Sequence, residues 1–443
     1  MLNTSQHPSN QFEVFAESQK VGSLMITSEM KFTFRYDQCW LKSGYAISPH
    51  LPLDKPVDTK SLCRFLNNLL PEGSALECLL NNYSLSRHNL GGLLKHIASE
   101  SAGILHFQYP DTIEPEVREL SEQELGLRIS QGTNVVIFDG LFRLNVAGVQ
   151  KKLNVYLTPE NTYQLGTSAL PSTHILKFMP PAYSIVLNEL FCMLMAEAIG
   201  LPVAKVEFRR LTRTKRLPDT LLVKRFDRDV SEDGTVSKRH IIDGCQALNL
   251  PPEHKYERLY GSHKDVAHCR DGANLSQLFG FVRERCQSED AIEQLLAWVC
   301  FNLVIGNSDA HAKNISFYVD PSGIHLAPFY DLVSIIFEAK GDPKLDTSLA
   351  MAIGDEFDIE AITAYHLLCF AEEVGITPEQ LKNVLLGVAT ACIKTASLSL
   401  CRDAKFSRRK NHCLTQLIEL IKQRANHFLG EVALFDEIQR TLF

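Results

Sequence analysis

Paired cysteines, long apolar stretches and an excess of positive charge are all missing from this sequence of 443 residues. Its 12 cysteines are scattered with no C-x-x-C pair, which predicts reduced core thiols and no structural zinc site. No apolar run approaches the roughly eighteen residues that cross a bilayer, and the first residues show no basic segment followed by an apolar one. We therefore expect a cytoplasmic protein with no membrane segment and no secretion signal.

The remaining composition is that of an ordinary globular protein, with 45% hydrophobic and 22% charged residues. A net charge of -7 excludes a chain that is basic throughout, as many nucleic-acid binders are, but it permits a local basic patch. The length exceeds what one hydrophobic core usually serves, so we expect more than one domain. Changes of pattern along the chain predict three regions: residues 1–110, 111–240 and 241–443.

Each region has its own periodicity. Apolar and polar residues alternate from Phe12 to about Tyr36, which predicts a small antiparallel meander, and two helices that break at Pro71 follow it. After a charged linker, short strand-like segments surround a helical segment at residues 184–199 and predict a strand-rich lobe. From Ile241 onward we expect helices, interrupted by a single hairpin.

The richest concentration of chemistry lies in residues 288–333. Ser288 is a good N-cap, the apolar run 292–305 has the length of a buried helix, and Gly306 is a natural stop. A polar loop follows, and a hairpin with an Asp-Pro-Ser-Gly turn then leads to Asp331. Carboxylate and amide side chains are thus expected at both ends of one hairpin.

The spacing of these polar residues is that of a protein kinase catalytic loop. Asp309 and Asn314 match its D-x-x-x-x-N pattern, and Asp331 follows the next hairpin as a metal-binding aspartate would. Phosphoryl transfer needs a base for the attacking hydroxyl and hard oxygen ligands for magnesium. Asp309 would be the base, and Lys313 could neutralise charge on the moving phosphoryl group. Simple capping and turning after a helix remains the alternative.

A kinase also needs a strand lysine on the phosphates and a helix glutamate that holds it. Lys177 and Glu189 occur in the right order, although each alone is more typical of a solvated surface. The stretch 146–152 joins two expected strands, and its small residues would let backbone amides approach phosphates, but it lacks G-x-G-x-x-G. The stretch 222–227 would be the connector that pairs with adenine.

Five segments, FRLNVAGVQKK, STHILKF, LLVKRFDR, IGNSDAHAKN and LAPFYDLVS, together resemble the HipA family of bacterial toxin serine/threonine kinases. The resemblance covers nearly the whole chain. It implies an α+β, two-lobed protein-kinase-like fold with a strand-rich N-lobe, an all-helical C-lobe and an N-terminal α/β accessory subdomain. It also implies that ATP and Mg²⁺ serve to phosphorylate an aminoacyl-tRNA synthetase, glutamyl-tRNA synthetase in the best-known case, which halts translation and promotes dormancy. The implied partner is HipB, a dimeric helix-turn-helix antitoxin that carries the kinase into a repressor complex on operator DNA.

The resemblance assigns roles residue by residue. The catalytic group is Lys177, Asp309, Asn314 and Asp331, with Asn314 and Asp331 as the magnesium ligands and Glu189 as the ion-pair partner of Lys177. The implied ATP site consists of Ala147, Gly148, Val149, Gln150, Lys151, Lys152, Lys177, Lys224, Arg225, Phe226, His311, Ala312, Lys313, Asn314, Tyr330 and Asp331.

One position departs from the family pattern. Family members often carry a serine just before V-A-G in the phosphate loop, where autophosphorylation switches the enzyme off, whereas this chain has Asn145. An amide cannot accept a phosphoryl group. We therefore expect regulation by the antitoxin or through another hydroxyl, such as Thr167 or Ser168.

Other interpretations stay open. An inert homologue could act as a co-repressor, although such a protein has no physical reason to keep all four catalytic residues. Asp309, His311 and His325 could form the metal site of a phosphohydrolase, but such sites need more ligands. Cys245 and Cys300 lie in apolar surroundings and are expected to pack rather than react.

The strongest basic cluster of this acidic chain is residues 405–412. A solvated helix start is its simplest interpretation. Arg408, Arg409 and Lys410 are also candidates for direct contact with operator DNA beside an antitoxin.

Overall fold

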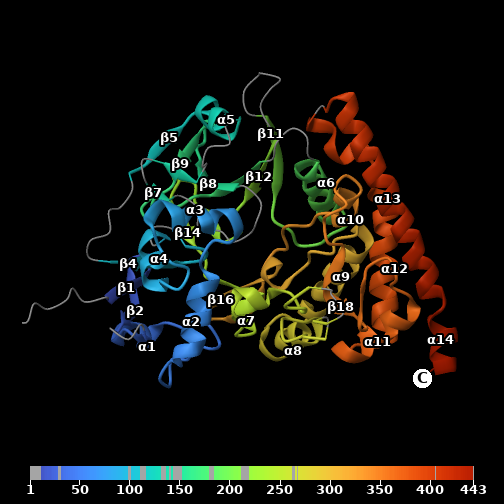
Figure 1. Cartoon of the computed structure of the whole chain (residues 1–443), viewed down its shortest axis with the longest axis horizontal. Coiled ribbons are helices and arrows are strands. Elements are labelled where there is room, and N and C mark those ends of the chain that lie inside the picture. The colour runs from blue at the N-terminus through green and yellow to red at the C-terminus, as the bar shows by residue number, and fades with distance from the viewer. Residues whose placement is uncertain are drawn as a thin grey trace, which may run out of the picture. The chain divides into compact units, whose positions relative to one another are not determined.

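The chain divides into two compact units, which Figure 1 draws together. Unit 1 contains residues 1–177, 225–242 and 318–322, and unit 2 contains residues 178–224, 243–317 and 323–443. The three sequence regions stay a prediction beside this division. The computed structural model describes residues 11–27, 31–97, 101–109, 116–130, 136–138, 141–142, 152–178, 184–210, 219–261, 265–266, 268–404 and 406–442.

The beginning of unit 1 is a four-stranded antiparallel sheet with short helices against it. The predicted meander is confirmed, because the first three strands pair in sequence, and a fourth strand returns to pair with the first. Alternate side chains of the first strand, including Phe12 and Val14, are buried. Two helices break at Pro71 as expected. The elements are β1 (Gln11–Ala16), β2 (Gln19–Ile26), β3 (Phe32–Tyr36), α1 (Gln38–Ser43), α2 (Thr59–Asn68), α3 (Gly73–Tyr83), α4 (Leu90–Ile97) and β4 (Leu105–Gln108).

The rest of unit 1 is strand-rich, as predicted. β8 pairs with both β9 and β10, and β9 pairs with β5, all antiparallel. The elements are β5 (Arg118–Leu120), α5 (Glu122–Ser130), β6 (Ile137–Phe138), β7 (Leu141–Phe142), β8 (Lys152–Leu157), β9 (Tyr163–Leu165), β10 (His174–Phe178), β13 (Arg228–Val230) and β14 (Val236–Lys238).

Unit 2 is mainly helical and is built around one buried helix, α9. α9 packs against α12 and α13, which lie beside it in Figure 1, and its Trp298 and Phe301 are almost fully buried. The expected helix at 184–199 is confirmed as α6. The helices are α6 (Ile185–Ala198), α7 (Gly244–Ala247), η1 (Pro252–Lys255), α8 (Leu275–Arg285), α9 (Ala291–Ile305), η2 (Ala312–Asn314), α10 (Ile335–Ala339), α11 (Ala364–Val374), α12 (Pro378–Thr395), η3 (Leu398–Ala404), α13 (Arg408–Ala433) and α14 (Phe435–Leu442).

The remaining strands, of which β15 and β16 contain residues of both units, outnumber the prediction. The expected hairpin after Asn307 is present, but the expectation of helices everywhere else after Ile241 is wrong, because β15, β18 and β19 also occur there. β18 is buried along nearly its whole length. Its residues therefore lack the alternation of apolar and polar side chains from which a strand can be predicted. The strands are β11 (Val206–Arg210), β12 (Asp219–Lys224), β15 (Ile241–Asp243), β16 (Ser316–Asp320), β17 (Gly323–Leu326), β18 (Ser348–Ile353) and β19 (Glu356–Asp358).

Membrane-spanning helices are absent from the described part of the chain: none of its helices is both long enough and apolar enough to cross a bilayer.

Candidate active site

The buried helix α9 sets the position at which the polar loop 307–314 begins. It ends at Gly306, as predicted, where a backbone φ of 73° suits glycine. The prediction for its start is wrong: Asp290 precedes the first helical residue, and the Ser288 hydroxyl donates to the Asp290 carboxylate instead of capping the helix.

A residue of α13 closes the C-terminal end of α9. Carbonyl groups in the last turn of a helix lack partners within the helix. The carbonyl of Leu303 accepts from Nε and Nη2 of Arg424, at 3.0 and 2.8 Å. Burial lowers the pKa of Arg424 to about 10, so the guanidinium stays charged at neutral pH. Arg424 therefore fixes the point at which the polar loop begins.

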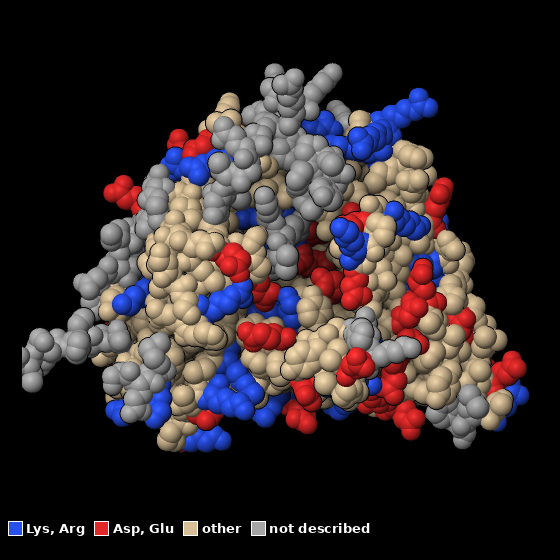
Figure 2. Space-filling view, viewed as in Figure 1, with Lys and Arg blue, Asp and Glu red and all other residues tan. Residues whose placement is uncertain are grey.

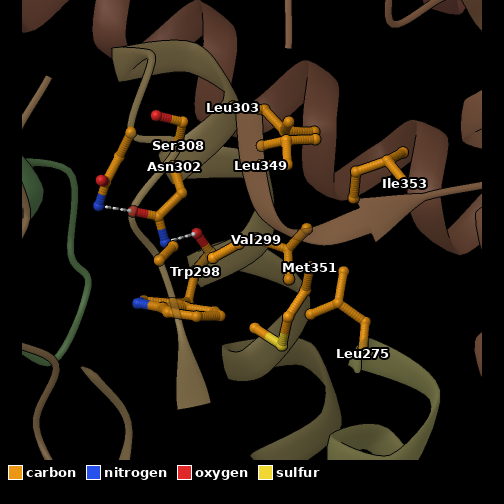
Figure 3. Close-up of a pocket in the computed structure, with 12 residues that line it drawn as sticks. Leu275, Trp298, Val299, Asn302, Leu303, Ser308, Leu349, Met351 and Ile353 are labelled. Carbon is orange, nitrogen blue, oxygen red and sulfur yellow. Dashed lines mark hydrogen bonds between the residues drawn. The ribbon is translucent and has the colours of Figure 1, made fainter. Parts of the chain in front are cut away.

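Two side-chain amides, those of Asn302 and Asn307, link α9 to the loop through hydrogen bonds. Asn302 Nδ2 donates to the carbonyl of Trp298 at 2.9 Å, and Asn307 Nδ2 donates to Asn302 Oδ1 at 2.8 Å, as Figure 3 shows. Asn307 Oδ1 in turn accepts from the backbone N–H of Asp309 at 3.2 Å. The backbone of Asp309 is thus held by a relay of hydrogen bonds that starts inside the helix.

β18 supports the loop from the other side. The N–H of Ala350 donates to the carbonyl of Ser308 at 2.8 Å. Between β18 and the helices α8 and α9 remains a cavity of about 30 Å³, into which Leu349, Met351 and Val299 point (Figure 3). This cavity is mostly apolar and has room for little more than a water molecule. It therefore belongs to the packing behind the loop rather than to a ligand site.

The structure brings Asp309 and Asn314 together as predicted. Asn314 Nδ2 donates to the carbonyl of Asp309 at 2.9 Å, while Asp309 and Ala310 are partly exposed in a loop whose other residues are buried. Tyr256, which the sequence did not indicate, donates its hydroxyl to Asp309 Oδ1 at 2.8 Å. The loop therefore presents one carboxylate from a rigid frame.

Lys313 already has an anionic partner. Its Nζ lies 2.5 Å from Oδ2 of Asp243, and both side chains are largely buried. Asp243 also caps α7 by accepting from the N–H of Gln246 at 2.8 Å. Sequence reasoning missed Asp243, whose one visible signal was its position before a short helix.

Tyr330 and Asp331 follow the hairpin and return to the loop. The Tyr330 hydroxyl donates to the carbonyl of Lys313 at 2.7 Å and lies 2.8 Å from Oγ of Ser316. Asp331 has a φ of 58°, a left-handed conformation that costs a non-glycine residue energy and is concentrated at functional sites. The bond from Tyr330 thus ties the segment that carries Asp331 to the segment that carries Asn314.

These two oxygen donors suit magnesium better than zinc. Within the described residues no group of three or more His, Cys, Asp or Glu side chains is arranged to hold a metal, so the phosphohydrolase alternative finds no support there. Magnesium in nucleotide sites needs only one or two protein ligands, since water and phosphate oxygens supply the rest. Asn314 and Asp331 fit that requirement.

The lysines predicted to meet phosphates are buried rather than solvated. Lys152 and Lys177 face each other on β8 and β10, with 3% and 6% of their surface exposed, and Glu189 of α6 is also buried. A buried charge needs a partner. The ion pair of Lys177 with Glu189 stays a prediction, and Asn145 and Ala147 to Lys151 lie outside the described residues.

In the predicted connector, backbone groups already have partners. The N–H of Lys224 donates to the carbonyl of Lys205 at 2.8 Å, and the N–H of Arg225 to that of Thr173 at 3.0 Å. The carbonyl of Phe226 accepts from the Tyr318 hydroxyl at 2.8 Å. Contact of this segment with adenine stays a prediction.

The arginine of the connector belongs to a buried charge cluster. Arg225 donates from Nε and Nη2 to the two oxygens of Asp227, at 2.9 and 2.8 Å. Asp227 also accepts from Arg228 Nη1 at 2.8 Å and from the N–H of Gly103 at 2.9 Å. Burial alone would raise the pKa of Asp227, but the two guanidinium groups outweigh it and hold the pKa well below its usual range. This cluster therefore joins two parts of unit 1.

The hydroxyls proposed for regulation differ in access. Thr167 is 5% exposed, and its Oγ1 accepts from the N–H of Leu170 at 2.9 Å, so it is poorly placed to receive a phosphoryl group. Ser168 is partly exposed. The expectation that Cys245 and Cys300 pack in the core is confirmed, because both are fully buried.

Comparison with known proteins gives consistent matches. Residues 12–108 match the family model described as the HipA N-terminal domain, and residues 144–396 match the HipA-like C-terminal domain. The serine/threonine-protein kinase toxin HipA of Shewanella oneidensis is 37% identical over 365 residues, which cover 81% of this chain and 82% of that protein. Y4mE of Sinorhizobium fredii is 33% identical over 82% of this chain and 85% of its own length.

A solved structure resembles nearly the whole chain. It is the Shewanella oneidensis complex of HipA, HipB and operator DNA, which matches with a TM-score of 0.85 and 31% identity over 96% of this chain and 99% of that one. The predicted α+β, protein-kinase-like fold with an N-terminal subdomain is thereby confirmed.

Proposed function

This chain belongs to the HipA family, and from that premise we propose that it is a serine/threonine protein kinase that uses ATP and magnesium. One observation carries the proposal: Asp309 offers a partly exposed carboxylate from a loop whose backbone is fixed by Asn307, Asn314 and Ala350. Preorganisation of this kind is what phosphoryl transfer asks of a protein. The kinase name of the Shewanella relative supports the same reaction.

In the proposed reaction, Asp309 accepts the proton of the acceptor hydroxyl while that oxygen bonds to the γ-phosphorus. The bond between the γ-phosphorus and the bridging oxygen breaks, and ADP leaves. Asn314 and Asp331 would hold magnesium, which neutralises phosphate charge when bound. Lys177 keeps the phosphate-binding role that the resemblance implies, with Glu189 as its partner.

We further propose an aminoacyl-tRNA synthetase, glutamyl-tRNA synthetase first, as the protein substrate, and a HipB-like antitoxin as the partner. The first rests on the family resemblance alone. The second is supported by the Shewanella complex, which contains HipA with HipB and operator DNA. The proposed consequence is blocked translation and dormancy in the cytoplasm of a bacterium.

A transfer assay tests the kinase proposal against an inert co-repressor. Labelled ATP is incubated with the chain and either recombinant glutamyl-tRNA synthetase or cell lysate, and Asp309→Ala is compared with the wild type. Loss of the base is expected to reduce transfer by about two orders of magnitude or more. Asp54→Ala, which removes an exposed carboxylate outside the loop, is the matched control. Transfer that survives Asp309→Ala, or phosphate release without protein labelling, contradicts the proposal.

Direct contact with operator DNA is proposed for a basic surface at the start of α13. Arg408 and Arg409 are exposed, and Figure 2 shows lysine and arginine side chains gathered at this end of the helix. Lys410 Nζ lies over the rings of Phe208 and Phe406, at 5.4 and 5.9 Å from their centres. Arg210 of β11 reaches the same surface, where it donates to the carbonyl of Ala404 at 2.8 Å. Lys405 lies outside the described residues.

Salt dependence tests this contact. Arg408→Gln, Arg409→Gln and Lys410→Gln together should flatten the slope of log affinity against log salt for operator binding by the chain and its antitoxin. The expected change is about one for each phosphate that the variant no longer neutralises. Replacing the exposed Lys42, Lys55 and Lys60 by glutamine is the control of equal charge. An unchanged slope in the first variant excludes direct contact at this surface.

A further inference from the structure

We infer that Tyr256 is a positioning residue for the base, which holds one oxygen of Asp309 so that the other meets the acceptor hydroxyl. This inference deepens the proposed kinase function and rests on it. Its first support is the hydrogen bond of 2.8 Å from the Tyr256 hydroxyl to Asp309 Oδ1. The phenol comes from the chain just after η1, 53 residues before Asp309.

The tyrosine ring is fixed by the same loop that it serves. The rings of Tyr256 and His311 meet at 90°, with 5.1 Å between their centres. Edge-to-face contact of this kind favours one orientation of the phenol. Because His311 lies two residues after Asp309, the ring and the hydroxyl both contact the catalytic loop.

The backbones on either side of the bond share one anchor. The N–H of Glu257 donates to the carbonyl of Ala350 at 2.9 Å, and the N–H of Ala350 donates to the carbonyl of Ser308 at 2.8 Å. Glu257 directly follows Tyr256, and Ser308 directly precedes Asp309. A single residue of β18 therefore sets the separation between the phenol and the carboxylate.

The side chain of Glu257 strengthens this anchor. It is 2% exposed, and its Oε2 accepts from the N–H of Ala352 at 2.7 Å. Its Oε1 accepts from Nε of Arg270 at 2.7 Å. Behind it the chain passes so closely that a Cβ on Gly272 would lie 1.7 Å from the carbonyl oxygen of Tyr256. Packing of this density leaves the tyrosine little freedom to move away from Asp309.

The chemistry explains why a base would need such a neighbour. A carboxylate can rotate about its Cβ–Cγ bond, and rotation moves the oxygen that must receive the proton. A hydrogen bond from the phenol to Oδ1 fixes the plane of the carboxylate and directs Oδ2 toward the acceptor. The phenol keeps its own proton throughout, while the proton of the acceptor hydroxyl passes to Asp309. Misplaced reacting groups cost rate rather than nucleotide affinity.

Kinetics of Tyr256→Phe test the inference. This change keeps the ring and removes the hydroxyl. With glutamyl-tRNA synthetase as the probe acceptor, kcat is expected to fall about ten-fold, while KM for ATP stays within about two-fold of the wild type. Tyr260→Phe is the matched control, because Tyr260 lies in the same segment and is 66% exposed. An unchanged kcat overturns the inference, and so does an increased one, which would make the phenol a competitor of the substrate.

A thermal cycle separates failure of the inference from failure of the kinase proposal. Melting temperatures are measured for the wild type, Tyr256→Phe, Asp309→Ala and the double variant, because alanine, unlike asparagine, removes the acceptor of the hydrogen bond from Tyr256. If Tyr256 holds Asp309, the two shifts are not additive. Additive shifts overturn the positioning role even if the chain is a kinase. If the wild type transfers no label to any protein, the proposed function fails, and non-additive shifts still assign Tyr256 the role of fixing Asp309.

Discussion

The loop after α9 and the connector after β12 look alike in sequence, since each places charged residues directly behind an apolar run. In the connector, Asp227 is 4% exposed, and two arginines and a backbone amide bind its oxygens. In the loop, Asp309 is partly exposed, and its Oδ1 accepts from a neutral phenol. A carboxylate enclosed by cations holds a fold together, whereas a base must stay within reach of its substrate.

Asp309→Asn is expected to give the largest difference between a loss of activity and a loss of stability. Label transfer should fall by about two orders of magnitude or more, because an amide cannot take up the proton. The midpoint of urea unfolding should barely change, because asparagine keeps the shape and can still accept from Tyr256. A strongly destabilised Asp309→Asn would instead group Asp309 with Asp227 as a residue of the fold.

Asp227→Asn should act mainly on stability, as the opposite of Asp309→Asn. Two buried arginines would lose their counterion, and breaking a buried pair in this way costs about 3–5 kcal/mol. The pKa of Asp227 is lowered in the folded chain, so its stabilisation is present above the unfolded pKa of roughly 4 and is lost as pH falls toward the folded value. Urea unfolding between neutral and acid pH measures both effects. Asp229→Asn, at an exposed position nearby, should cost little.

His240 should give unit 1 a smaller dependence on pH. Burial lowers its pKa to about 4, although its hydrogen bond to the carbonyl of Ile47, at 2.7 Å, opposes this. An unfolded histidine takes up a proton near pH 6.5, so stability should fall as the pH drops from about 6.5 to about 4. His240→Gln should remove this part of the slope, and the exposed His88→Gln should leave it intact. Equal slopes in all three chains would exclude His240 as the cause.

Local spacing was enough to predict the central residues of the site. Asp309, Asn314 and Gly306 stand within one short stretch, where a helix stop and a polar loop follow from residue type alone. Their supports come from far along the chain: Tyr256 is 53 residues from Asp309, and Arg424 is 121 residues from Leu303. No periodicity reports contacts across such separations.

Whether a charged residue is solvated or enclosed could not be predicted from its sequence position alone. A lysine at the end of a strand is usually solvated, yet Lys152 and Lys177 are almost completely enclosed. The prediction of helices after Ile241 missed β18 for a related reason. A strand buried on both faces has the same continuous apolar run as part of a buried helix. The anchor at Ala350 could therefore not be foreseen, and with it the setting of Tyr256 against Asp309.

The bond from Arg424 to Leu303 has a consequence for synthesis on the ribosome. A chain emerges from its N-terminus, so α9 is complete long before Arg424 can close its end. Until then the hydrogen bonds through Asn302 and Asn307 start from a helix in which the carbonyl of Leu303 has not yet met Arg424. We expect chains that stop before Arg424, nascent ones included, to be inert, so that an enzyme proposed to halt translation cannot act before Arg424 has been synthesised.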